Sequence, residues 1–277
     1  MKFSTIHLRL KSANSLPIET ILWHRFLFPC LIPIIALLAW FFLTQGQNSE
    51  SIFPTPQSVW HVTVRLTKNG VLWNNLWVSS LRAIAGFIIG GGIGFLLGVL
   101  NGQFKIAEEI LNTPIQMIRN VPHLALLPLI LIWFGLGETS KIILIALGCF
   151  FPIYLNSFYG IRHIDKKLLE MGKVYGLTHR ETFQNIIFPG ATPSIMVGIR
   201  QSLGRMWITL IVAETVAAKS GIGYMATNAR EFMQIDIIVL TLIIYAVLGS
   251  FSDFAAAKIE KHLLRWHQNY RKILEES

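Results

Sequence analysis

Residues 80–100 read SLRAIAGFIIGGGIGFLLGVL, and this segment settles the fold class. The segment is apolar over about 20 residues, the length that an α-helix needs to cross a bilayer core. Residues four apart share one face of a helix, and small residues on that face let a second helix approach closely. Such residues recur at Gly86, Gly90, Gly94, Gly98 and Gly102. We therefore predict a membrane-crossing helix here, with helix packing along Gly86, Gly90, Gly94 and Gly98.

The composition of the whole chain agrees with a membrane protein. Of its 277 residues, 53% are hydrophobic and only 14% are charged, and the mean hydropathy is +0.53. Soluble domains carry about 25% charged residues on average. The high apolar content also excludes intrinsic disorder. We predict an all-α, polytopic bundle of membrane helices.

Six segments are long and apolar enough to be spans, or nearly so. The third of them is short and contains Pro122 and Pro128, so a helix that starts near Ile106 and kinks at Pro122 is an alternative for it. The first span would be an uncleaved one rather than a signal peptide. The predicted spans are 26–44, 80–100, 121–136, 141–160, 194–218 and 235–257.

Lysine and arginine set the orientation, because they accumulate in cytoplasmic segments. With a cytoplasmic N-terminus, the inside segments hold sixteen of them and the outside segments five. We therefore expect both termini inside, with a cytoplasmic segment at 1–25, a membrane domain at 26–257 and a cytoplasmic tail at 258–277. We attribute the net charge of +9 to residues that flank the spans and contact lipid, and expect no nucleic-acid partner.

The longest basic inside loop, 161–193, reads IRHIDKKLLEMGKVYGLTHRETFQNIIFPGATP. It could be a solvated connection, or it could dock a cytoplasmic partner. Its pattern favours docking: an amphipathic helix ends at Gly176, and Thr178 with Glu181 forms a capping box that starts a second helix. We expect Pro189, Gly190 and Pro193 to end that second helix before the next span.

The same loop resembles the permease subunits of bacterial ABC importers. Their loop carries Glu-Ala-Ala, three residues, Gly, nine residues, Ile, one residue and Leu-Pro. At that spacing this chain has Glu170, Gly176, Ile186 and Pro189. Met171 and Gly172 replace the two alanines, and Phe188 replaces the leucine. By this resemblance Glu170, Gly176, Ile186 and Pro189 are the residues that dock an ATPase.

The resemblance extends over most of the chain after about residue 25. Residues 53–60, 118–141 and 211–236 are similar to the nitrate, sulfonate and taurine branch of these permeases. Residues 151–165 and 189–215 are most similar to its aliphatic sulfonate permeases. The resemblance implies a type I importer fold in the bacterial inner membrane, with two permease copies that each dock one ABC ATPase, and a periplasmic binding protein that delivers the substrate.

Nucleotide chemistry is expected to come from the partner. The chain contains no G-x-x-x-x-G-K-[ST] phosphate-binding motif. ATP and Mg would therefore bind to the ATPase, and this chain would carry no cofactor, no catalytic residue and no enzyme activity. Its eight histidines are scattered without the spacing of metal ligands, which predicts no metal site.

Ionisable residues within the fifth span are candidates for the substrate pathway, because such residues face a cavity or a partner. Helical geometry places Arg200, Trp207 and Glu214 on one face, and Arg205 nearly opposite Glu214. Arg205 or Arg200 could help to pass an anionic sulfonate. For Glu214, near the outer end, we prefer a structural role, although it could belong to an outer gate. Trp207 would be core or a pocket wall.

Two further residues at span ends have simpler interpretations. We interpret Arg82 as an interfacial residue at the outer side, with attraction of anions or contact with the binding protein as the alternative. We interpret His123 as a structural histidine, with a position along the inner pathway as the alternative.

Three other functions remain open. The same machinery could import taurine, nitrate or another small anion, because a fold does not fix a substrate. A membrane enzyme would need converging acid, base or metal groups, and the sequence contains none that we recognise. A stand-alone secondary transporter would leave the docking loop unexplained, and we find no clear internal repeat.

Overall fold

The computed structural model describes residues 28–45 and 53–266, which form helices and no strands. The predicted segment 1–25 and the end of the predicted tail lie outside these ranges. The helices are α2 (Phe28–Leu43), α3 (Pro56–Lys68), α4 (Val71–Gln103), α5 (Lys105–Arg119), η2 (His123–Leu126), α6 (Leu127–Phe134), α7 (Glu138–Arg162), α8 (Lys166–Val174), α9 (His179–Thr182), η3 (Phe183–Ile187), α10 (Phe188–Ala217), α11 (Ile222–Glu231) and α12 (Ile235–Leu263).

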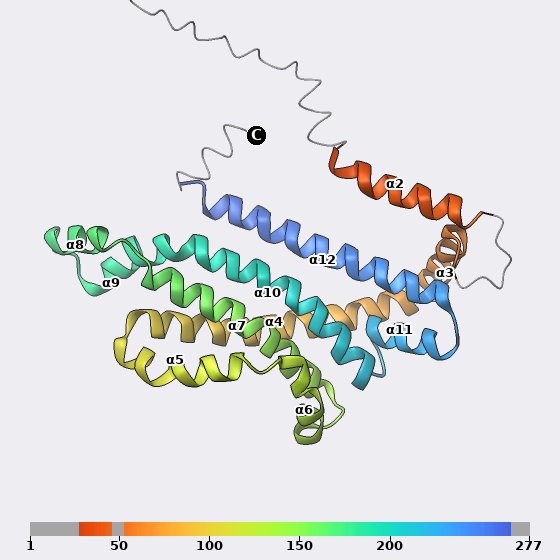
Figure 1. Cartoon of the computed structure of the whole chain (residues 1–277), viewed down its shortest axis with the longest axis horizontal. Coiled ribbons are helices and arrows are strands. Elements are labelled where there is room, and N and C mark those ends of the chain that lie inside the picture. The colour runs from red at the N-terminus through yellow and green to blue at the C-terminus, as the bar shows by residue number, and fades with distance from the viewer. Residues whose placement is uncertain (1–27, 46–52, 267–277) are drawn as a thin grey trace, which may run out of the picture. The chain divides into compact units, whose positions relative to one another are not determined.

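The chain divides into two compact units, one up to Ser58 and one from Val59 onwards. In the first unit, the Trp40 indole N–H donates a hydrogen bond to the Pro54 carbonyl, at 3.0 Å. In the second unit, α4 packs along α7, α7 along α10, and α10 against α12 (Figure 1). Helices α8 and α9 lie at one end of this bundle, called here the loop end, and α11 lies at the other, called the α11 end.

Four helices of the described chain are long and apolar enough to cross a membrane: Val71–Gln103, Glu138–Arg162, His179–Ala217 and Ile235–Leu263. The bent pair of Lys105–Arg119 and His123–Phe134 gives a fifth span if the two helices count as one. The apolar helix α2, which corresponds to the predicted first span, has 16 residues. The helical membrane architecture is therefore confirmed, and the count of six spans stays a prediction.

The predicted third span, 121–136, corresponds to η2 and α6, which follow a sharp bend of the chain. Lys105–Arg119 and His123–Phe134 meet at 82°, with the break just before Pro122. A proline has no backbone N–H and disfavours helical geometry at the residue before it, here Val121, which explains the position of the break. The alternative, a helix with an earlier start and a kink at Pro122, agrees with the position of this bend, and the limits of the third span stay a prediction.

The prolines after the docking loop do not end a helix, contrary to our expectation. α9, the π-helical turn η3 and α10 run on as one helix from His179 to Ala217. Pro189 lies two residues after the π-helical turn η3, and Pro193 lies inside α10, so both prolines lie within the continuous helix. The fifth predicted span therefore continues directly from the loop.

The glycine stripe of α4 lies against α7. A Cβ atom added at Gly86 would come within 2.5 Å of Ile145, and one at Gly94 within 2.5 Å of the Phe150 carbonyl. A Cβ atom added at Gly98 would lie 2.7 Å from the Tyr154 carbonyl oxygen. These separations are too short for any side chain, so the two backbones touch because the residues are glycines.

Candidate functional site

The docking loop forms a compact helical protrusion at the loop end. Asp165 caps α8 by accepting a bond from the Lys167 amide, and Gly176 ends that helix with φ +71°. Thr178 and Glu181 then form both bonds of a capping box at the start of α9, as predicted. A glycine suits the left-handed conformation at position 176 because it has no Cβ.

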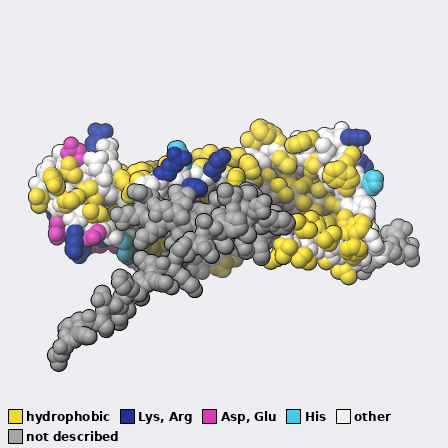
Figure 2. All heavy atoms as spheres, turned by 90° about the horizontal axis from the view of Figure 1, so that it is seen from above, with side chains coloured by type: hydrophobic (Ala, Val, Ile, Leu, Met, Phe, Trp, Pro, Cys, Tyr) yellow, Lys and Arg dark blue, Asp and Glu magenta, His cyan; other side chains and the backbone are white. Residues whose placement is uncertain are grey.

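The protrusion exposes apolar side chains. Val174 is 86% exposed and Tyr175 is 77% exposed. Charged side chains of both signs gather at the same end, on the left in Figure 2. An exposed apolar patch with a charged rim is typical of a protein interface.

The four residues expected to dock an ATPase have different environments in this protrusion. Glu170 is exposed on α8, and Gly176 forms the turn between the helices. Ile186 is half-buried, and an added Cβ at Gly172 would come within 2.9 Å of its Cδ1 atom. Pro189 is half-buried in the first turn of α10. Gly172 and Ile186 thus hold the two helices of the protrusion together.

On α10, Arg200 has acidic partners. Its guanidinium lies 3.0 Å from Asp253 and 3.3 Å from Glu260, both on α12. Its charge therefore joins two helices in the half of the bundle nearer the loop end.

Arg205 lies on a different face of α10 and is exposed beside Gly204. No carboxylate of the described chain lies within 4.0 Å of its nitrogens. Glu214 on the same helix is buried.

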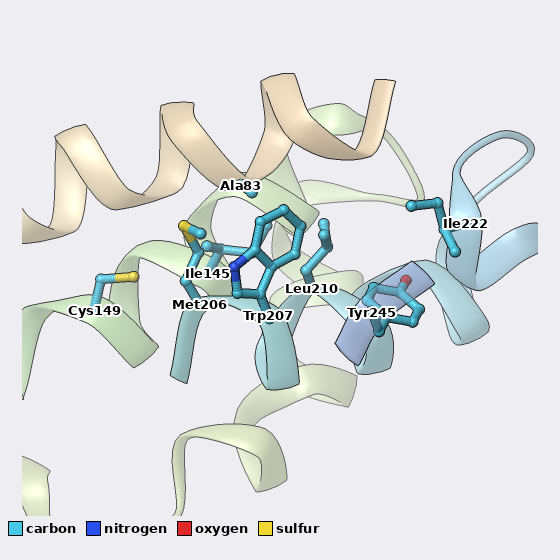
Figure 3. Packing of buried hydrophobic residues seen from close by; sticks show 8 residues of the cluster. All are labelled: Ala83, Ile145, Cys149, Met206, Trp207, Leu210, Ile222 and Tyr245. Carbon is cyan, nitrogen blue, oxygen red and sulfur yellow. The ribbon is translucent and has the colours of Figure 1, made fainter. Parts of the chain in front are cut away.

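Trp207 belongs to the core. Its side chain belongs to a buried apolar cluster to which α4, α7, α11 and α12 also contribute, and Figure 3 shows its indole beside Leu210. The indole N–H donates to Ser252 Oγ at 2.9 Å. The indole N–H of Trp207 therefore has its hydrogen-bond partner inside the protein.

Glu214 lies at the centre of a buried polar network near the α11 end. Its carboxylate accepts hydrogen bonds from Arg82, Ser79 and the Gly223 amide at 2.7 to 2.8 Å, and a longer one, 3.4 Å, from Tyr245. The side chain of Glu214 is fully buried. The carboxylate thus has several hydrogen-bond donors around it and one cation, Arg82, paired with it.

Arg82 completes this network, and its interpretation as an interfacial residue is wrong. Arg82 is 3% exposed. Its guanidinium bonds to Glu214 at 2.7 Å, to both oxygens of Glu138 at 2.5 and 2.7 Å, and to the Ser220 carbonyl at 2.6 Å. Lys141 also bonds to Glu138, at 2.8 Å. We call Arg82, Glu138, Lys141 and Glu214 the charged cluster, in which two cations balance two anions.

The turn before α11 is fastened to the charged cluster. The Gly221 amide donates to Asn75 Oδ1 at 2.7 Å, and the Ile222 amide donates to Ser79 Oγ at 2.8 Å. Gly221 has φ +111°, and a Cβ there would collide with the Glu214 carboxylate. Sequence reasoning missed this arrangement, because Arg82 and Glu214 are 132 residues apart and no spacing rule connects them.

His123 lies at the break between α5 and α6. Its Nε2 atom is 3.2 Å from Thr209 Oγ1 on α10. The interpretation of a histidine with an internal partner is thus correct. Within the described ranges, no group of three His, Cys, Asp or Glu side chains is arranged to hold a metal ion.

The chain belongs to the family of inner membrane components of binding-protein-dependent transport systems, whose pattern matches residues 90–265. It is the permease subunit of an ABC importer, a multi-pass protein of the inner membrane and a transport subunit rather than an enzyme. Importers of this kind are assembled from such a permease, an ATPase and a binding protein. The resemblance inferred from the sequence is confirmed.

Individual relatives are similar over nearly their whole length. A protein of Escherichia coli (strain K12) that bears the name aliphatic sulfonates transport permease protein SsuC is 48% identical, over 90% of this chain and 95% of its own. Its namesake in Bacillus subtilis (strain 168) is 41% identical, over 87% of each chain. The fold is that of a solved amino acid ABC transporter, with TM-score 0.60 and 18% identity over 72% of this chain and 97% of the other.

Proposed function

We propose that this permease imports aliphatic sulfonates, which a periplasmic binding protein delivers and ATP hydrolysis on the partner ATPase drives. The main support for an anionic substrate is Arg205. This exposed cation lies in a membrane-crossing helix and has no acidic partner among the described residues. A guanidinium matches the oxygens of a sulfonate in charge and geometry. The names of the two relatives support the sulfonate in particular.

The proposed assembly has two copies of this permease, each docking one ATPase through Glu170, Gly176, Ile186 and Pro189. ATP and Mg bind to the ATPase. The exposed apolar side chains of the protrusion support docking, because a groove on a partner would bury them. Six spans, with both termini in the cytoplasm, would place this protrusion on the ATPase side.

Of the four pathway candidates, we keep Arg205. Arg200 forms an ion pair with Asp253 of α12, and Glu214 forms one with Arg82. The Trp207 indole donates its hydrogen bond to Ser252 in the core. We therefore assign structural roles to these three. An anion passing along α10 would meet Arg205 as the cation still free to bind it.

The test is the growth of a deletion strain on single sulfur or nitrogen sources, with rescue from a plasmid. Ethanesulfonate, a longer alkanesulfonate, taurine, sulfate and nitrate are compared. We expect a growth defect on the alkanesulfonates alone, restored by the wild-type gene. A defect on taurine or nitrate alone would replace the substrate and keep the importer. Equal growth on every source would contradict the proposed substrate.

A further inference from the structure

A cavity of about 710 Å³ lies at the loop end, at the base of the docking protrusion. Its walls come from four segments: the turn between α4 and α5, the end of α7, the first half of α8, and the helix that runs from α9 into η3. Figure 1 shows these segments gathered at one end of the bundle. The cavity therefore lies between the protrusion and the ends of two membrane-crossing helices.

Much of the cavity wall is apolar. α4 and α7 have 33 and 25 residues, more than the about 20 that cross a bilayer core, so their last turns reach the headgroup region. Phe104 follows α4 and is 58% exposed. A lipid chain can therefore approach the cavity from the bilayer. The large apolar side chains of the wall are Phe104, Ile161, Ile164, Leu169 and Ile187.

The charged side chains of the wall are basic. Arg162, Lys166 and His179 line the cavity, and within the described ranges no acidic residue does. Arg162 pairs with Glu108 of α5. No carboxylate of the described chain lies within 4.0 Å of the side-chain nitrogens of Lys166 or His179. These two groups are therefore available to an anion in the cavity.

The cavity is separate from the face proposed to dock the ATPase. Lys166 is the first residue of α8, whereas the exposed apolar residues Val174 and Tyr175 lie at the other end of that helix. Eight residues of α-helix, from 166 to 174, span about 12 Å. An ATPase that covers the tip of the protrusion can leave this cavity at its base open.

We infer that the cavity binds an anionic phospholipid, with its phosphate at Lys166 and His179 and an acyl chain along the apolar wall. The ammonium group attracts the phosphate as a point charge, and the imidazole donates an N–H bond to it. Basic pockets between membrane helices are typical sites for such headgroups. A free anion would leave the apolar wall uncovered, so an amphiphile fits better. The bound lipid joins both helices of the protrusion to the membrane surface.

The test titrates the purified complex of permease and ATPase in detergent with phosphatidylglycerol, and separately with phosphatidylcholine, and counts bound lipid by native mass spectrometry. Lys166→Gln with His179→Gln should raise the Kd of the tightest-bound phosphatidylglycerol at least about fivefold, the factor that one cation contributes near an anionic headgroup. Lys166→Arg should retain the lipid, because it keeps the charge. Phosphatidylcholine binding should be weaker and the same in all variants.

The matched control is Lys167→Gln with Arg180→Gln, which removes the two neighbouring cations that do not line the cavity. This control should leave phosphatidylglycerol binding unchanged. If it weakens binding as much as Lys166→Gln with His179→Gln does, the effect is one of total charge and the inference is wrong. Unchanged binding in both double variants would also overturn it.

Inorganic phosphate distinguishes a lipid from a free anion. Phosphate at about ten times the Kd of phosphatidylglycerol should not displace the lipid, because it lacks the apolar contacts. If phosphate binds through Lys166 and His179 and phosphatidylglycerol does not, the ligand is a free anion and the inference fails. The inference does not depend on the cargo, so absent ethanesulfonate uptake with intact lipid binding would reject the proposed substrate and support this site.

Discussion

At the scale of single residues, burial decides which charges are available for function. Arg82 and Arg205 are both arginines in membrane-crossing helices, yet Arg82 has two carboxylates and a carbonyl around it whereas Arg205 is exposed. A buried cation surrounded by acceptors is committed to the fold, because removing it leaves its partners unsatisfied. The exposed cation is free to bind a passing anion.

Removal of Arg82 tests the charged cluster. Arg82→Ala leaves Glu214 buried without its cation, which should cost about 3–5 kcal/mol of folding free energy. Glu214→Ala should cost a similar amount, and the double variant less than the two together, since each substitution removes the same interaction. Thermal unfolding of the purified transporter in detergent measures these effects. Fully additive losses would show that Arg82 and Glu214 are not coupled.

The residue scale is also where sequence reasoning was weakest. The capping box of Thr178 and Glu181 follows from local spacing and was predicted correctly. The bond of His123 to Thr209 joins residues 86 positions apart, and the partners of Arg82 lie on other helices. Such pairings depend on how helices pack, which neither periodicity nor local propensity encodes.

At the scale of elements, α4 and α7 meet through glycines, and α10 continues from the docking protrusion. The glycine stripe was recognisable in the sequence because a four-residue repeat is a property of one helix. The continuation of the helix through Pro189 was not recognisable in the sequence, because the effect of a proline on a helix depends on the turn before it.

Two alanine substitutions on the same helix test the close approach of α4 to α7. At Gly90 the new methyl group would collide with the backbone of Ala146, so Gly90→Ala should reduce the yield and thermal stability of the permease. At Gly92 it would meet nothing within 4 Å, and Gly92→Ala should be neutral or slightly stabilising, by up to about 1 kcal/mol. Equal effects of the two changes would argue against this packing.

The protrusion is tested by removing its exposed apolar side chains. Val174→Ala with Tyr175→Ala should lower the amount of ATPase that co-purifies with the permease, because exposed apolar groups gain free energy only when a partner covers them. Thermal stability of the permease alone should not change. Phe232→Ala, at a residue 66% exposed near the α11 end, is the matched control. Unchanged co-purification in the Val174 and Tyr175 variant would exclude this docking face.

At the scale of the whole molecule, this chain is the permease subunit of an ABC importer, in which a separate subunit is the ATPase. Composition and hydropathy predicted the membrane class, because they reflect the solvent in which the protein folds. The bend of 82° between α5 and α6 and the position of His123 at that bend came only from the structure. The substrate itself is inferred from Arg205 and from the relatives together.

The most direct test of the central claim is uptake of labelled ethanesulfonate into vesicles that contain the purified permease with its ATPase, with binding protein outside and ATP inside. The claim predicts uptake that requires both ATP and binding protein, and that stops when the ATPase is inactivated. Arg205→Gln should reduce that uptake while ATP hydrolysis continues. Uptake that persists without ATP or without the ATPase would contradict the account.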